Sequence, residues 1–477
     1  MNEARHEIGA WWAALIPAGM LCVLLSRSVW DVDVFWQLKL GELILNKGAP
    51  LRSEPFAALH IGEPMPAVAW LGQVIMALTR QIGGWPLLRL VDAMCWVGGL
   101  WACAAACRAR GATTTACALA LGVTFLLLLP TASVRPQSFA ALCFGALLAM
   151  RRLALPPFTS VLLAFPLFLV WQNLHPSVSV ATIAMAAVAV TVWLQRLAGR
   201  EGEPWVPTAL SAMSLAAMFA TPDGVSIVQV SVRNTEASVA IGASEWLPLW
   251  AASNHFHAAC VMACAAVALA LVMRHPKRVD ASELAVAGVL LVMTIFAYRF
   301  VLFWGAAMVP VFARVLTPEG RNRSIGPRSR LVLLASLLTV AATAPLLIPT
   351  RFAANIPLEA IASVERTGVR GTVYADYPYG GAIIDTGFPR WRVAYDGRYY
   401  RYSSEEWKYN GGIENGYVPL IDVVRKWRPC AFILNKKHNA PLVAELSRSS
   451  EWRLIYDNGA VAAFVASPRG LPAPAHP

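Results

Sequence analysis

Two aspartates stand two residues apart, at Asp31 and Asp33, directly after the first long apolar segment of the chain. A carboxylate at such a boundary is partly desolvated and can accept the proton of an attacking hydroxyl group, which is general base chemistry. The structural alternative is that an aspartate at a helix start caps backbone N–H groups and complements the helix dipole. Asp33 alone fits either role, whereas the pair favours function, with Asp33 as the first choice of base and Asp31 as the second.

A short amphipathic helix is predicted to hold these carboxylates in place. Over Asp33–Lys47, apolar side chains recur on one face and polar side chains on another. Gly48 and Pro50 are expected to end this helix. A helix of this kind suits the plane of a membrane interface, so both aspartates are expected at the level of the lipid headgroups. The apolar face holds Trp36, Leu40, Leu43 and Ile44, and the polar face holds Lys39, Glu42 and Asn46.

The composition is that of a polytopic α-helical membrane protein. Of 477 residues, 57% are hydrophobic and 14% charged, which excludes an ordinary soluble domain. The net charge of +12 comes from short Lys and Arg clusters between apolar runs, a pattern typical of membrane topology rather than of a nucleic-acid partner. Eleven transmembrane helices are predicted, at 8–26, 86–107, 112–130, 137–150, 158–174, 177–195, 206–221, 256–273, 283–298, 300–316 and 331–349.

The segment Ala69–Ile82 is predicted to be an interfacial or re-entrant helix, because it is short for a span and contains Gln73 and Arg80. With this assignment the basic clusters all fall on one side, which is then cytoplasmic together with the N-terminus, and Asp31 and Asp33 fall on the other. A span at 69–82 would reverse the sides. The clusters are Arg108 and Arg110; Arg151 and Arg152; Arg196 and Arg200; Arg274, Lys277 and Arg278; and Arg314, Arg321, Arg323, Arg328 and Arg330.

After Arg351 the pattern changes to short strands and helices, which predicts a mixed α/β domain on the extracytoplasmic side. The predicted division is a membrane domain over 1–350, whose first outer loop covers 27–85, and this second domain over 351–477. No nucleotide cofactor is expected, because the sequence contains no GxxxxGK[ST] motif. Strands are predicted at 372–375, 382–384, 391–395, 431–434, 452–456 and 461–465, and helices at 357–366 and 418–427.

Several short motifs share the predicted outer face with the Asp-x-Asp pair. They are Ser53-Glu54-Pro55-Phe56, Arg135-Pro136-Gln137, Trp171-Gln172-Asn173-Leu174-His175, Tyr379-Gly380-Gly381 and Asp396-Gly397-Arg398. In their order they resemble the GT-C superfamily of multi-pass membrane glycosyltransferases, and more closely its uncharacterised bacterial branch, distantly like the protein O-mannosyltransferases and aminoarabinose transferases. The chain departs from the pattern at Glu54, where Asp is commoner, and at Thr221-Pro222-Asp223-Gly224, where Asn-Pro-x-Gly is usual.

The resemblance implies an enzyme of the bacterial inner membrane that transfers a sugar from a polyprenyl-phosphate carrier to an acceptor on the outer face, with inversion. Asp33 or Asp31 would act as base. Arg135 and Arg299 would bind the departing phosphate, since a guanidinium binds two phosphate oxygens while staying ionised. Glu54 would contact the substrate. A glycan, a lipid or a protein acceptor all stay open.

Four further residues on this face are candidates for substrate binding, each with an ordinary alternative. Asn173 and His175 end a span, where a lone histidine is more often a hydrogen-bonded core residue. Glu245 and Trp246 would bind a sugar through a carboxylate and an aromatic face, unless the tryptophan is an interface anchor. A divalent metal ion is a weaker alternative, and its ligands would be Asp31, Asp33, His255 and His257.

Two aromatic segments of the second domain, Tyr374–Gly381 and Asp396–Tyr402, would either stack on sugar rings or pack as glycine-containing turns. Two other functional classes also stay open. A lipid or glycolipid transporter would place charges within a helical bundle, although transporters often show paired repeat halves and this sequence shows none. A catalytically silent scaffold would retain the fold without the activity.

Overall fold

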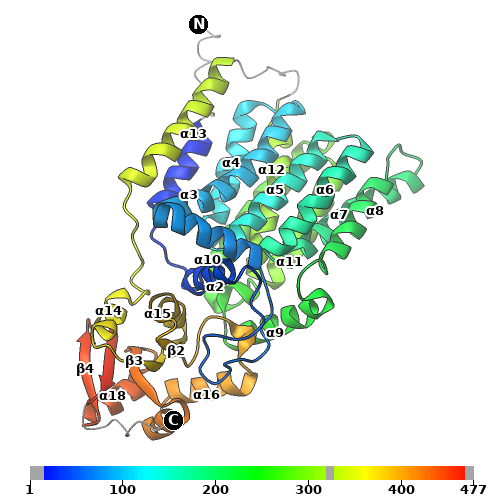
Figure 1. The fold of residues 1–477 in the computed structure, drawn as a ribbon. Helices are drawn as coiled ribbons and strands as arrows, with labels where there is room; N and C mark the ends of the chain where they lie inside the picture. The colour runs from blue at the N-terminus through cyan, green and yellow to red at the C-terminus, as the bar shows by residue number, and fades with distance from the viewer. Residues whose placement is uncertain (1–14, 319–326, 468–477) are drawn as a thin grey trace. The chain divides into compact units, whose positions relative to one another are not determined.

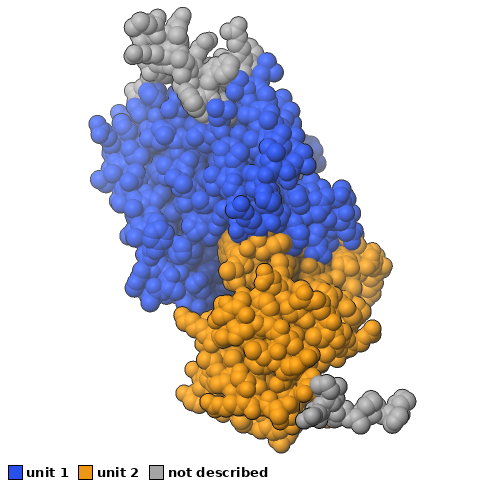
Figure 2. All heavy atoms as spheres, turned by 90° about the vertical axis from the view of Figure 1, so that its left-hand side faces the viewer, with its two compact units in different colours: residues 1–28, 68–227, 242–351 blue, residues 29–67, 228–241, 352–477 orange. Residues whose placement is uncertain are grey.

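The computed structural model describes residues 15–318 and 327–467 of the chain, and these fall into two compact units. Unit 1 is formed by residues up to Ser28, by Val68–Ile227 and by Gly242–Arg351. Unit 2 is formed by Val29–Ala67, Val228–Ile241 and the chain from Phe352 onward. Figure 2 draws unit 1 in blue and unit 2 in orange.

Unit 1 is helical, and its helices pack closely where small residues meet (Figure 1). A Cβ atom on Gly99 of α3 or on Gly145 of α5 would overlap the backbone of the other helix, so glycine permits this crossing. The helices are one at Leu15–Ser26, α3 (Trp70–Ala109), α4 (Thr114–Leu128), α5 (Gln137–Leu153), α6 (Pro157–Leu174), α7 (Val178–Leu197), α8 (Trp205–Ala217), α10 (His255–Arg274), α11 (Ala281–Phe296), α12 (Val301–Val315) and α13 (Pro327–Leu347).

The long helix α3 contains a break where the sequence predicted a boundary. Gly83 (φ −138°, ψ 19°) and Gly84 (φ 63°, ψ −161°) leave the helical region, and Pro86 follows. A positive φ is accessible to glycine at no steric cost. The residues from Trp70 to the break therefore form a segment distinct from the apolar run that ends at Ala109, as the interfacial-helix prediction requires.

Each of the eleven predicted spans overlaps a helix of the structure, the first over its described part only. Within the described residues, seven helices are long and apolar enough to cross a membrane, and the helices at Leu15–Ser26, Trp205–Ala217 and Ala281–Phe296 are apolar but shorter. The helical membrane fold is thus confirmed, while the number of crossings stays a prediction. The seven are Trp70–Ala109, Thr114–Thr131, Pro157–Leu174, Val178–Leu197, Ala252–Arg274, Tyr298–Val315 and Arg330–Leu347.

Several of the predicted cytoplasmic arginines lie together at one end of unit 1. Arg152, at the end of α5, pairs with Glu283 at the start of α11, with 3.3 Å between Nη1 and Oε1. Arg314, at the end of α12, lies 3.4 Å from Glu283 and 3.6 Å from Asp280. We call this the basic end of unit 1. The opposite helix ends carry Arg135, His175 and Arg299, and we call them the polar end.

Unit 2 is built on a five-stranded sheet in the order β2-β1-β3-β5-β4 (Figure 1). β1 pairs in parallel with β2 and β3, and β5 pairs antiparallel with β3 and β4. The strands are β1 (Gly371–Ala375), β2 (Trp391–Val393), β3 (Pro429–Asn435), β4 (Trp452–Asp457) and β5 (Val461–Ala466). The helices are α2 (Asp33–Lys47), α9 (Ile227–Ala240, from Val228 onward), α14 (Leu358–Arg366), α15 (Gly380–Gly387), α16 (Ser404–Glu414), α17 (Leu420–Trp427) and α18 (Ala440–Arg448).

The predicted strand at 382–384 is wrong, because these residues lie in helix α15. Ala382, Ile383 and Ile384 are all buried, and a short apolar run that is buried on every side has the same sequence pattern in a strand and in a helix. α15 connects the parallel strands β1 and β2, a connection that normally needs a helix. The other predicted strands and both predicted helices of this domain are present.

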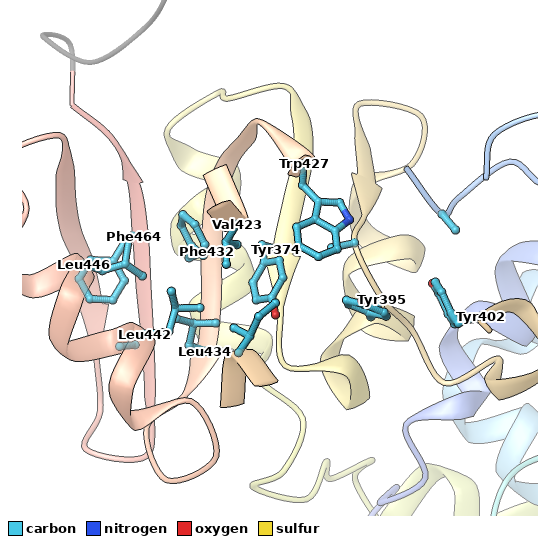
Figure 3. Close-up of a cluster of buried hydrophobic side chains, with 14 of the residues drawn as sticks. Tyr374, Tyr395, Tyr402, Val423, Trp427, Phe432, Leu434, Leu442, Leu446 and Phe464 are labelled. Carbon is cyan, nitrogen blue, oxygen red and sulfur yellow. The ribbon is translucent and has the colours of Figure 1, made fainter. Parts of the chain in front are cut away.

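Aromatic side chains fill the core of unit 2 (Figure 3). Tyr374 lies against Trp427 and Phe432, with ring centroids 5.3 and 5.6 Å apart. Tyr395 and Tyr402 are also buried, 5.0 Å from each other. Of the two interpretations of the aromatic segments, the structure favours packed turns, since these rings belong to the core.

Most of the first outer loop, Val29–Ala67, belongs to unit 2 rather than unit 1, which differs from the predicted division at residue 350. Ala57 pairs with Val393 of β2 as a parallel bridge, and Val29 pairs with Phe352 in the same way. α2 packs on α15 within this unit. The loop that carries the Asp-x-Asp pair is therefore part of the same compact body as the sheet.

Candidate functional site

The Asp-x-Asp pair stands at the start of α2, and its two carboxylates have different environments. Asp31 is 5% exposed, and its Oδ1 accepts a hydrogen bond of 3.0 Å from the backbone N–H of Asp33. Asp33 is partly exposed, and its Oδ1 accepts a 3.0 Å hydrogen bond from Trp36 Nε1. Asp31 thus makes the contact expected of a capping residue, whereas Asp33 presents the more accessible carboxylate.

Glycines allow two turns of unit 2 to approach this helix start closely. A Cβ on Gly397 would overlap Asp33 Oδ1, and a Cβ on Gly381 would lie 2.6 Å from the carbonyl oxygen of Val32. Gly380 packs in the same way against the backbone of Tyr395. Only glycine leaves room for these approaches. The Tyr379-Gly380-Gly381 and Asp396-Gly397-Arg398 motifs therefore serve to hold the start of α2.

Arg398 is the centre of a buried ion cluster that ties the loop to the sheet domain. Its side chain and that of Glu54 are 0% exposed, with Nη1–Oε2 and Nη2–Oε1 distances of 2.6 and 2.9 Å. Arg398 also donates from Nη2 and Nε to the two oxygens of Asp396, at 2.6 and 2.9 Å. Burial alone would lower the pKa of the guanidinium, but Asp396 and Glu54 raise it well above its usual value. Arg398 therefore stays charged, with both carboxylates as its partners.

Glu54 was predicted to contact the substrate. In the structure its Oε1 also accepts hydrogen bonds from the backbone N–H groups of Phe56 and Ala57, at 2.8 and 2.9 Å. These contacts fix the turn after α2 and hold it to Arg398. Binding of substrate by Glu54 stays a prediction, whereas the contacts that the structure shows are structural.

The polar end of unit 1 brings together residues that are far apart in the sequence. Arg135, just before α5, donates from Nη2 to Glu245 Oε2 at 2.6 Å, and the two side chains are 15% and 33% exposed. The guanidinium carbon of Arg299 lies 3.7 Å from the ring centroid of Trp246, a cation–π contact. The charge of Arg299 also acts on Glu245, so two guanidinium groups lie near this carboxylate.

His175 is neutral in this cluster at physiological pH. Burial and the positive charges of Arg299 and Arg135 lower its pKa to about 3, although Glu245 opposes this in part. The ring Nδ1 lies 2.9 Å from Ser177 Oγ. Glu245 is ionised, because Arg135 and Arg299 outweigh the effect of burial and lower its pKa to about 2. The neutral imidazole therefore adds no charge to the cluster.

Asn173 joins three segments of the polar end. Its Oδ1 accepts a 2.7 Å hydrogen bond from Trp70 Nε1, and its Nδ2 donates to the carbonyl oxygens of Leu169 and Ala220 at 2.9 and 2.8 Å. The protein itself thus uses both N–H groups of the amide and one hydrogen bond to its oxygen. The contacts are those of a structural residue, and binding of substrate by Asn173 stays a prediction.

The turn at Thr221-Pro222-Asp223-Gly224, where the family pattern has Asn, keeps a side-chain cap. Thr221 Oγ1 accepts a 3.2 Å hydrogen bond from the backbone N–H of Asp223, which is the role that an Asn side chain plays in an Asx turn. Gly224 follows at φ 55°. Thr221 can thus replace the amide in forming the turn.

The two histidines of the metal alternative belong to unit 1, and the two aspartates belong to unit 2. His257 stacks on Tyr298, with ring centroids 4.3 Å apart and planes at 17°. Among the described residues, no three His, Cys, Asp or Glu side chains gather closely enough to hold a metal ion. The residues that the structure describes therefore form no site that fits a divalent metal ion.

An apolar groove opens at the polar end of unit 1, beside Tyr298 and hence next in the chain to Arg299. It has a volume of about 370 Å³ and is lined by the end of α4, by the start of α10, and by Arg27 and Tyr298. Arg27 donates to the carbonyl oxygens of Leu129 and Ala132, which holds it at the groove. Its apolar lining includes Leu126, Leu127, Leu129, Pro130, Phe256 and Val261.

Asp376, at the end of β1, is a buried carboxyl that the sequence did not single out. It is 2% exposed, its Oδ2 lies 3.3 Å from His438 Nδ1, and Oδ1 is buried without a hydrogen-bond partner. Burial raises its pKa to about 6, since His438 offsets only part of the desolvation.

We expect unit 2 to lose stability as the pH rises through this pKa. Between about pH 4 and pH 6 the folded state holds a proton on Asp376 that the unfolded chain has released, so the free energy of unfolding falls by roughly 3 kcal/mol. Asp376→Asn should flatten that part of the profile. Hydrogen-exchange protection of β1 and β3, measured from pH 4 to pH 7, would reveal the slope. An identical profile in the variant would contradict this assignment.

The predicted site residues thus form two groups. Unit 2 holds Asp31, Asp33 and Glu54, and it adds Arg398, whose pairing with Glu54 and Asp396 the sequence did not predict. Unit 1 holds Arg135, Glu245, Trp246, Arg299 and His175 in one cluster, with Asn173 beside it. The Asp-Gly-Arg motif was visible in the sequence. However, nothing in the neighbouring residues indicates that the side chains of Asp396 and Arg398 are buried.

Comparison with known proteins identifies solved structures of the same fold. No protein-family model and no curated protein sequence matches the chain. The structure resembles the archaeal oligosaccharyltransferase AglB from Archaeoglobus fulgidus, solved with an inhibitory peptide and a dolichol-phosphate, with a TM-score of 0.57 and 10% identity over 99% of this chain and 75% of that one. The apo oligosaccharyltransferase of the same organism gives a TM-score of 0.52 and 11% identity, covering 98% of this chain and 75% of that one.

The arabinofuranosyltransferase AftD from Mycobacteria is also similar, with a TM-score of 0.56 and 14% identity over 96% of this chain. This chain spans only 40% of the length of that protein. At such identities the likeness establishes the fold. Both neighbours have the GT-C fold, and the chain therefore has this fold as well.

Proposed function

We propose that the chain is a membrane glycosyltransferase that transfers a sugar from a polyprenyl-phosphate carrier to a hydroxyl or amide acceptor on the outer face of the membrane. The observation that supports this most strongly is the polar end of unit 1, where Arg135 pairs with Glu245 and the charge of Arg299 acts on the same carboxylate. Two guanidinium groups and an apolar groove at the same end of unit 1 match a ligand with an anionic head and a long apolar tail.

In this proposal the arginines of unit 1 bind the phosphate of the donor. Each guanidinium offers two parallel N–H groups to phosphate oxygens. The contact of Arg299 with Trp246 and the contact of Arg135 with Glu245 fix both side chains before the ligand binds, which lowers the entropy cost of binding. The isoprenoid chain lies in the groove between α4 and α10. Trp246 and Glu245 contribute to the binding of the sugar.

Asp33 is the proposed base. The acceptor oxygen or nitrogen attacks the anomeric carbon and its proton passes to the Asp33 carboxylate. The bond between that carbon and the phosphate oxygen breaks, and the polyprenyl phosphate leaves with the electron pair. A single displacement of this kind inverts the anomeric centre. Asp31 acts through its hydrogen bond to the Asp33 backbone and is a positioning residue.

The proposed location is the bacterial inner membrane, with the basic end of unit 1 in the cytoplasm and unit 2 outside. The clustering of Arg152 and Arg314 at one end agrees with the positive-inside rule. The acceptor is a glycan, a lipid or a protein.

Binding and turnover of the donor test this function. We expect membranes that contain the chain to release labelled sugar from a polyprenyl-phosphate donor. Arg299→Ala should raise the KM for the donor about ten- to a hundredfold, because a charge-assisted contact with the phosphate is lost. Arg200→Ala, an exposed arginine at the basic end, is the matched control and should leave the KM unchanged.

Two outcomes would count against the proposal. Binding of the donor without release of sugar would favour a transporter or a silent scaffold. An unchanged KM in Arg299→Ala, with sugar still released, would contradict the assignment of the phosphate site while leaving the activity in place.

A further inference from the structure

The basic end of unit 1 contains a cavity that the proposed transfer reaction does not use. Its volume is about 220 Å³, and it lies among the ends of α5 and α11 and the middle of α7 and α12. Its inner wall is apolar, with Leu148, Met185, Val188, Val286, Ala307 and Pro310, and its charged residues are Arg110, Arg151, Arg152, Asp280 and Glu283. It therefore combines an apolar wall with a charged opening.

Both carboxylates of the cavity already have cationic partners. Glu283 Oε1 lies 3.3 Å from Arg152, and its Oε2 lies 3.4 Å from Arg314. Asp280 caps α11, because its Oδ1 accepts a 2.8 Å hydrogen bond from the backbone N–H of Ser282, and its Oδ2 lies 3.6 Å from Arg314. Four arginines thus surround two carboxylates, which leaves two positive charges in excess.

That excess is located on Arg110 and Arg151. Within the described part of the chain, neither guanidinium forms an ion pair or a side-chain hydrogen bond, and both line the cavity. Arg152 adds a buried Nε without a hydrogen-bond partner. Guanidinium groups at the mouth of an apolar cavity call for an anion with several acceptor oxygens, and a phosphate has that chemistry.

We propose that this cavity binds the phosphate group of an anionic phospholipid, with Arg110 and Arg151 as its ligands and Arg152 as a third donor. Water occupies about 30 Å³ per molecule in the liquid, so the cavity has room for a phosphate and a few waters. Basic pockets between membrane helices on the cytoplasmic side bind anionic headgroups. The apolar wall then contacts the glycerol and the first methylenes, while the acyl chains lie along exposed apolar side chains such as Leu153, which is 37% exposed.

The proposal predicts a preference for lipid charge that depends on two residues. The full chain, purified in detergent, is incubated with phosphatidylglycerol or with phosphatidylcholine of the same acyl chains, and bound lipid is counted by native mass spectrometry. The unmodified chain should retain phosphatidylglycerol at least about tenfold better than phosphatidylcholine, since both lipids offer the phosphate but the trimethylammonium group of phosphatidylcholine brings a positive charge close to the arginines. The double variant Arg110→Gln/Arg151→Gln should lose the preference.

The double variant should fold normally, because neither arginine has an ion-pair partner in the described residues that would be left unpaired. Its melting temperature without added lipid serves to check this. Arg196→Gln is the matched control, since Arg196 is exposed at the end of α7 and does not line the cavity. It should keep the preference for phosphatidylglycerol.

Three results would overturn the proposal. They are equal retention of the two lipids by the unmodified chain, an undiminished preference in the double variant, and an equal loss of preference in Arg196→Gln. A fourth arm uses inorganic phosphate alone. Displacement of phosphatidylglycerol by inorganic phosphate at equal concentration would show that the cavity recognises a free anion, and would overturn its assignment to a lipid.

Discussion

Asp33→Asn is expected to slow sugar transfer about a hundred- to ten-thousandfold, the usual contribution of a positioned general base. The variant should leave the start of α2 intact, because an Asn Oδ1 can still accept the 3.0 Å hydrogen bond from Trp36 Nε1. The loss should therefore appear in kcat, with the KM for the donor little changed. Release of labelled sugar from a polyprenyl-phosphate donor by purified protein measures both.

Asp31→Asn is the matched control for that variant. Asn caps a helix about as well as Asp, so the contact with the backbone N–H of Asp33 survives and most of the activity should remain. Comparable losses in Asp31→Asn and Asp33→Asn would mean that the pair shares the proton or binds a common group. Full turnover in Asp33→Asn would exclude this carboxylate as the base.

Arg398→Leu is expected to destabilise unit 2 by about 3–5 kcal/mol, the typical cost of removing one partner from a buried ion pair. The substitution leaves Glu54 and Asp396 buried without a counter-charge, and in addition removes the contact of the guanidinium with the Phe56 ring, 5.2 Å away. Hydrogen-exchange mass spectrometry of the loop after α2 and of β1 should report loss of protection. Activity should fall with it, because the same loop carries Asp33.

Arg390→Leu provides a comparison in the same domain. Arg390 pairs with Glu365 at 2.5 Å, but the two side chains are 39% and 40% exposed, and exposed pairs contribute about 0–1 kcal/mol. Exchange protection in that variant should resemble the parent chain. If Arg398→Leu also left the protection unchanged, the ion cluster would not be what holds the loop to the sheet.

The sequence was sufficient to predict helices and strands whose pattern is local and repeats along the chain. The amphipathic spacing that starts at Asp33 and the Gly48 that follows Lys47 predicted α2 with its observed bounds, because both ends depend on residues within one turn. The helices α14 and α17 and most strands were found in the same way. The predicted strand at 382–384 was wrong, because a short segment that is buried on all sides is apolar throughout and shows no hydrophobic period that would distinguish a strand from a helix.

The hydrogen-bond and ion-pair partners of individual side chains could not be predicted from the sequence. Glu54 and Arg398 are 344 residues apart, and Trp70 and Asn173 are 103 apart. Nothing local to Glu54 distinguishes a carboxylate that binds a ligand from one that holds a turn. The sides assigned from the basic clusters placed Arg135, Glu245 and Arg299 on one face, and the structure adds that both arginines act on the same carboxylate. That grouping of two guanidinium groups, which a list of motifs does not show, supports an anionic ligand.

The separation of Glu54 and Arg398 also sets an order of events during biosynthesis. At a translation rate of about 5–20 residues per second, roughly 20 to 70 s pass between the synthesis of the glutamate and that of its partner. Throughout that interval the Asp-x-Asp loop has been made but lacks the arginine that fixes it. A nascent chain therefore acquires its candidate base in final form only after almost the whole polypeptide exists, so that incomplete products would be inert toward lipid-linked sugars.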